Sequence, residues 1–84
     1  MNVLNEKRVE KALEDLKYLE EELVPCWAEE DHALFLLCEG ERYTQETTDK
    51  YDNVLLLGMA LSHIRKSTEL LRSLLKVNAK KMEN

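Results

Sequence analysis

The residues whose types could bind a metal lie together in the acidic segment Glu29-Glu30-Asp31-His32. Glu29 and His32 are three residues apart, so on a helix both side chains face the same way, as they do in di-metal helical bundles. Such bundles need this pair twice, with two further inward-facing glutamates, and at His63 the matching earlier position is Ala60. A single chain lacks the second pair, so we predict no metal site and no cofactor. Two copies of Glu29 and His32 across a dimer form a metal-binding alternative.

The other reactive side chains form no catalytic set. No Ser, Thr or Cys lies in a recognisable nucleophile signature, and His63 is next to Arg65 and Lys66 on a predicted helix. Gly40 and Gly58 are isolated, which excludes a glycine-rich phosphate loop. Gly58 inside a helix instead indicates a place where two backbones approach closely. We therefore predict that the protein is not an enzyme.

The two cysteines and the apolar segments bear on location. Cys26 and Cys38 would be about 18 Å apart on one helix, which is beyond the reach of a disulfide. Such thiols predict a reduced, cytoplasmic protein. The first residues lack the basic and apolar regions of a secretory signal. The apolar stretch 54–61 is less than half of the roughly 20 residues that span a bilayer, so we predict no membrane segment.

The composition predicts helices. Among 84 residues there are only two glycines and one proline, and 35% are charged, which favours long helices over sheets. We interpret residues 1–84 as a single helical domain. A core of this size supplies only about 3–5 kcal/mol on its own, so the short length is the first indication of assembly.

The spacing of apolar residues predicts three helices. The first covers about 5–23, a short second helix covers about 26–39 after an interruption at Pro25, and a long third helix covers about 48–78. The predicted fold is therefore all-α: a helical hairpin with a short middle helix, which completes a multi-helix bundle by dimerisation. The alternative is an α+β fold with a small hairpin at 33–45, because a short apolar run is also compatible with a strand.

The first and third helices each show an apolar stripe. In the first helix, Val9, Leu16 and Leu23 hold one seam position, Ala12 and Leu19 hold the other, and Leu13 widens the stripe. In the third, residues at steps of three and four extend from Val54 to Asn78. The third helix would be about 46 Å long and the first about 28 Å, so part of the leucine stripe would stay exposed. The predicted interface residues are Val54, Leu57, Leu61, Ile64, Leu71 and Leu75, with Trp27 as an anchor.

The charge distribution indicates which partners fit. Residues 1–50 hold 14 acidic and 6 basic side chains, whereas residues 51–84 hold 3 and 6, and the formal net charge is -5. A net acidic chain argues against general nucleic-acid binding, although the basic end of the third helix supports a nucleic-acid-binding regulator as a second alternative. The split also predicts complementarity between the two halves.

These observations together predict a non-catalytic helical protein–protein interaction module. It would be a small adaptor, inhibitor or regulatory protein that acts through a homodimer or by packing on a partner helix.

Overall fold

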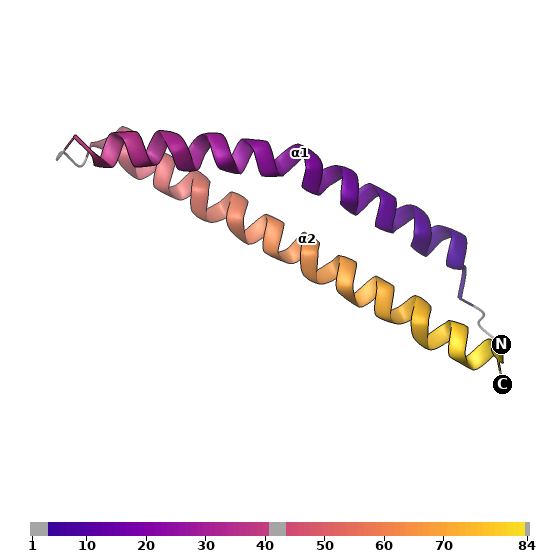
Figure 1. Ribbon diagram of the computed structural model, residues 1–84. Coiled ribbons are helices and arrows are strands. Elements are labelled where there is room, and N and C mark those ends of the chain that lie inside the picture. The colour runs from indigo at the N-terminus through magenta and orange to yellow at the C-terminus, as the bar shows by residue number, and fades with distance from the viewer. Residues whose placement is uncertain (1–3, 41–43, 84) are drawn as a thin grey trace.

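The computed structural model describes residues 4–40 and 44–83, which form the helices α1 (Glu6–Cys38) and α2 (Gln45–Glu83). The helices lie side by side and antiparallel, with the start of α1 and the end of α2 at the same end (Figure 1). The all-α prediction and the helical hairpin are confirmed. The small β-hairpin at 33–45 is wrong, because residues 33–38 are the last turns of α1. Residues 41–43 of that alternative lie outside the described residues.

Helix α1 is continuous where two helices were predicted. The segments 5–23 and 26–39 form one helix that passes through Pro25. Proline cannot donate the helical hydrogen bond to the residue four positions earlier, and α1 changes direction near its middle (Figure 1). At 1.5 Å per residue α1 is about 50 Å long and α2 about 58 Å. The predicted mismatch in length, in which a short helix leaves much of a long one uncovered, is therefore wrong.

Side-chain caps begin both helices. The Asn5 side chain accepts a hydrogen bond from the backbone N–H of Arg8 at 3.3 Å. The Thr44 hydroxyl accepts one from the backbone N–H of Thr47, also at 3.3 Å. Each cap satisfies a donor that would otherwise be free in the first turn. Because Thr44 is the cap, α2 begins three residues earlier than the predicted 48, and it continues beyond the predicted 78 to Glu83.

One seam joins the helices, with residues at alternating steps of three and four along each helix. The α2 seam consists of Thr47, Lys50, Val54, Leu57, Leu61, Ile64, Thr68, Leu71, Leu75 and Asn78. The α1 seam consists of Val9, Leu13, Leu16, Glu20, Leu23, Trp27, Glu30, Leu34 and Leu37. The α2 stripe is therefore as predicted. In α1 the prediction holds at Val9, Leu16 and Leu23, but Leu13 takes the place given to Ala12 and Glu20 the place given to Leu19, which is 46% exposed.

The core of the hairpin is thin. Among the side chains that the structure describes, Leu61 is the one buried apolar residue, with 5% of its surface exposed. Two helices cover each other along one stripe only, so the seam residues other than Leu61 and the buried Thr47 keep part of their surface in water. The chain exposes 7129 Å², whereas a compact monomer of 9.9 kDa exposes about 5,200 Å². A large surface is thus left for further packing.

Candidate interaction surface

The predicted interface residues lie inside the hairpin. The six α2 residues, Val54, Leu57, Leu61, Ile64, Leu71 and Leu75, belong to the α2 seam, and Trp27 belongs to the α1 seam. The Trp27 ring packs beside Gly58, where an added Cβ would lie 3.5 Å from the indole Nε1. The close approach at Gly58 is thus made by a side chain rather than by a second backbone. These residues form the chain's own core, so a surface for a partner has to be sought elsewhere.

An ion pair between α1 and α2 lies in the seam near the connection between the helices. The Lys50 Nζ lies 2.7 Å from a carboxylate oxygen of Glu30, and about a third of the lysine side chain and a quarter of the glutamate side chain are exposed. The hydrogen bond with Glu30 raises the pKa of Lys50 from its ordinary value, against the opposing effect of desolvation. Together the two side chains carry no net charge, whereas either charge alone would be unfavourable at this partly buried position.

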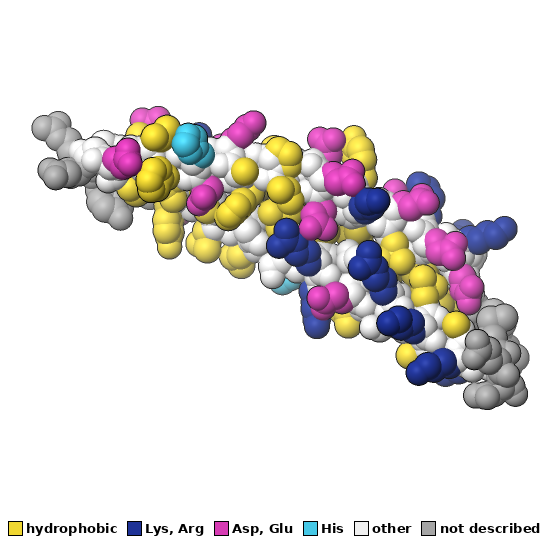
Figure 2. Space-filling view, viewed as in Figure 1, with side chains coloured by type: hydrophobic (Ala, Val, Ile, Leu, Met, Phe, Trp, Pro, Cys, Tyr) yellow, Lys and Arg dark blue, Asp and Glu magenta, His cyan; other side chains and the backbone are white. Residues whose placement is uncertain are grey.

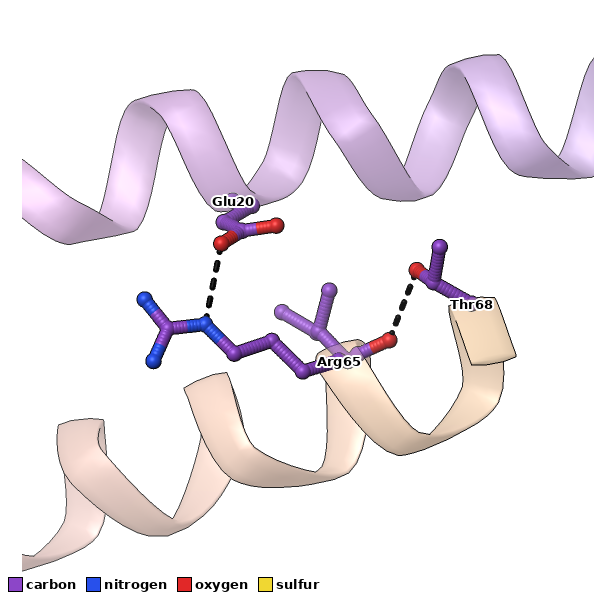
Figure 3. Close-up of polar contacts among 4 residues, drawn as sticks. Glu20, Arg65 and Thr68 are labelled. Carbon is purple, nitrogen blue, oxygen red and sulfur yellow. Dashed lines mark hydrogen bonds and ion pairs between the residues drawn. The ribbon is translucent and has the colours of Figure 1, made fainter. Parts of the chain in front are cut away.

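A second cross-helix pair lies near the middle of the hairpin (Figure 3). The Nε of Arg65 donates to Oε1 of Glu20 at 2.9 Å, so the arginine reaches across from beside the α2 seam. One turn further along α2, the Thr68 hydroxyl donates to the backbone carbonyl of Ile64 at 2.9 Å. Both polar side chains in this part of the seam thus have partners, which is what allows them to lie among leucines.

The two sides of the seam differ in charge. We call one side the charged flank: Lys17 and Val24 of α1 meet Gly58, Arg65 and Arg72 of α2 along it. A shallow groove of about 500 Å³ lies on this flank where α1 passes through its proline, and it is lined by two cations, two glutamates and an apolar floor. In Figure 2 most of the basic side chains lie in the half of the molecule with the chain ends, whereas acidic side chains are spread along the whole length of the hairpin.

The opposite side of the seam is the uncharged flank. Since the charged flank lies on one side of both seams, helix geometry places the residues flanking the other side together. They are Ala12, Leu19, Cys26 and Ala33 of α1 with Asn53, Ala60, Ser67 and Leu74 of α2. Six of the twelve exposed large apolar side chains lie on this flank or in the next row outward: Leu19, Leu36, Leu56, Leu70, Leu74 and Val77. The row directly beside the seam is thus without formal charge from Ala12 to Ala33 on α1 and from Asn53 to Leu74 on α2, whereas the next row outward on α1 holds Arg8, Asp15, Glu22 and Glu29.

The remaining candidate residues are exposed. Glu29 and His32 are both exposed on α1, and within residues 4–40 and 44–83 no group of three His, Cys, Asp or Glu side chains is placed to hold a metal ion. Cys26 and Cys38 are free and exposed. In the basic part of α2, Lys66 lies 3.7 Å from Glu69. The structure therefore brings neither the metal candidates nor the cysteines into a common site.

No protein-family model, curated protein or solved structure matches this chain. Over the described residues, neither helix is both long and apolar enough to cross a membrane. The proposals below therefore depend on the two flanks and the seam.

The uncharged flank was missed from the sequence, although a signal for it exists. Ala12, Leu19, Cys26 and Ala33 recur at heptad spacing, directly before the seam residues of α1. The predicted seam already includes Ala12 and Leu19, so the second stripe does not stand out from the first. The signal is a second uncharged row beside each seam, because helices of bundles carry such a row next to their two core positions.

Proposed function

We propose that this protein is a non-catalytic helical interaction module, an adaptor, inhibitor or regulator that completes its hydrophobic core on another helical surface. The thin core carries this proposal: one apolar side chain is buried among those described, while twelve large apolar side chains are exposed. Exposed apolar stripes of this extent on a small chain usually mark interfaces.

The arrangement of the helices supports the same function. A two-helix hairpin buries one stripe per helix, whereas bundles bury a wider face on each helix and gain stability from it. Each buried leucine contributes about 1.5–3 kcal/mol, so covering a few of the exposed leucines would more than double a marginal stability. The surface that a partner would cover extends along most of a molecule 63 Å long.

The location and the alternatives stay proposals as well. Two free cysteines, Cys26 and Cys38, fit a cytoplasmic, reducing environment. The metal-binding alternative would need Glu29 and His32 of two chains to face each other, and metal analysis of the purified protein tests it directly. The nucleic-acid alternative would depend on the basic end of α2, and mobility of DNA and RNA at low salt tests it. The apolar surface favours the protein partner over both.

Thermal unfolding at several protein concentrations tests the proposal. Association that stabilises the folded state makes Tm depend on concentration. Raising the concentration to about a hundred times the dissociation constant stabilises the folded state by about 2.7 kcal/mol. For a chain of this size, that stabilisation raises Tm by about 10–20 °C. Sedimentation of the same samples links the shift in Tm to a change in mass.

The opposite result is equally clear. A monomeric mass at every concentration, together with one cooperative transition at a fixed Tm, would show that the hairpin is stable without a partner. The proposed function would then be wrong. A monomer that unfolds gradually without a cooperative transition would still support it, because that is how a helical hairpin behaves when its completing surface is missing.

A further inference from the structure

The uncharged flank extends the packing pattern of each helix. In a bundle, a helix carries two core rows and a third uncharged row beside them, so that it contacts two neighbours rather than one. In α1 this third row is Ala12, Leu19, Cys26 and Ala33, and in α2 it is Asn53, Ala60, Ser67 and Leu74. The charged flank cannot serve in the same way, because Lys17, Arg65 and Arg72 would lose their hydration there.

We propose that a second copy of this chain docks on the uncharged flank, giving a twofold four-helix bundle in which α1 of each copy packs on α2 of the other. This inference rests on the proposed function and names its partner. The small side chains of Ala12, Ala33 and Ala60 let the helices approach closely. Leu19 and Leu74 fill the spaces between them.

The exposed area fits a second copy of the same size. The hairpin exposes 7129 Å², about 1,900 Å² more than a compact chain of its mass. A standard interface buries about 800 Å² on each partner, and stable homodimers bury more. Face-to-face stacking of two hairpins along their length can therefore bury this additional exposed area, and no further chain is needed.

Charge selects how the two copies are oriented. Helix α1 has ten acidic and four basic side chains, whereas α2 has five acidic and seven basic. If the twofold axis runs along the helices, each acidic α1 lies on a basic α2 of the partner and both connections lie at one end. If the axis crosses the helices, acidic α1 lies on acidic α1. The first arrangement is favoured, since like charges repel at an interface.

A label on Cys38 reports the orientation directly, because Cys38 is the last residue of α1 and lies next to the connection. A Cys26→Ser variant with a nitroxide label on Cys38 gives one distance per dimer. With both connections at one end, the labels are separated by a bundle diagonal, below about 30 Å including the labels for helices spaced 8–10 Å apart. With the connections at opposite ends, the separation is about 48 Å, close to the length of α1.

Two neighbouring lysine substitutions identify the face. Leu19→Lys lies on the uncharged flank, and Tyr18→Lys lies one position away on the outer surface, where its side chain is 63% exposed. Both new lysines have acidic neighbours one turn away on α1. We expect Leu19→Lys to weaken dimerisation by about a hundredfold or more, since two leucines are lost per dimer. Tyr18→Lys should change it by less than about threefold.

Each outcome decides between the claims. A dimer with a short label distance, weakened by Leu19→Lys alone, supports the inference. A dimer with a long label distance, or one weakened by Tyr18→Lys and not by Leu19→Lys, overturns it. A monomer without a cooperative transition overturns the second copy as partner but leaves the proposed function. A cooperative, stable monomer overturns both. Helicity measured by circular dichroism shows whether each variant is folded.

Discussion

Replacing Gly58 with alanine tests how closely α1 and α2 pack. Glycine inside a helix costs roughly 1 kcal/mol relative to alanine. An added Cβ would lie 3.5 Å from Nε1 and 3.9 Å from Cδ1 of Trp27, which is ordinary van der Waals contact. The gain in helix propensity is therefore not opposed by a clash. We expect the free energy of unfolding to rise by about 0.5–1 kcal/mol, and Tm to rise by about 4–8 °C at the upper value.

Thermal and urea unfolding, followed by circular dichroism, measure this change at one fixed protein concentration. Ser62→Ala is the matched control, because Ser62 is exposed one turn further along α2 and gains only helix propensity. Gly58→Leu is the opposing variant, since its larger side chain must displace Trp27 and should cost about 1–3 kcal/mol. If Gly58→Ala destabilises the protein while Ser62→Ala stabilises it, the helices are closer here than the structure has them, and the reasoning is refuted.

Three further predictions concern the seam and the start of α2. Leu61→Ala should lower the free energy of unfolding by about 2–5 kcal/mol, whereas Leu55→Ala, at a side chain 49% exposed, should cost under about 1 kcal/mol in urea unfolding. The raised pKa of Lys50 means that its contact with Glu30 stabilises the fold below pH 10.5 and is lost as the pH rises through the higher folded-state value. The Tm of the wild type should thus fall more steeply above pH 10.5 than that of Lys50→Gln, and parallel curves would contradict this. Thr44→Ala removes the cap of α2 and should cost about 1 kcal/mol in the same unfolding assay; no change would show that another group caps the helix.

The α2 seam could be predicted from the sequence because apolar residues fill it from Val54 to Leu75 with few exceptions. Its first two positions, Thr47 and Lys50, could not, since a threonine and a lysine interrupt the apolar pattern. Their place in the seam depends on Thr44, whose hydroxyl contacts Thr47, and on Glu30, which contacts Lys50. Such partners become visible only once the two helices are aligned.

The continuity of α1 was missed because Pro25 favours a helix end in any local reading. Tertiary packing outweighs that local preference here. The seam keeps its register across the proline, from Leu23 to Trp27 and Glu30, and that constant register is the signal that one helix spans both segments. Glu20 hid the same register, since a glutamate at a seam position looks like a break in the stripe until Arg65 is placed beside it.

The two cross-helix ion pairs have a consequence for how α1 and α2 line up. A purely apolar repeat would interdigitate almost equally well after one helix slipped along the other by seven residues. Such a slip would bring Lys50 opposite Leu23 or Leu37 and separate Arg65 from Glu20, leaving unmatched charges against leucine side chains. The polar interruptions thus select a single alignment from a set of near-equivalent ones, so that a chain with little core still folds to one defined length.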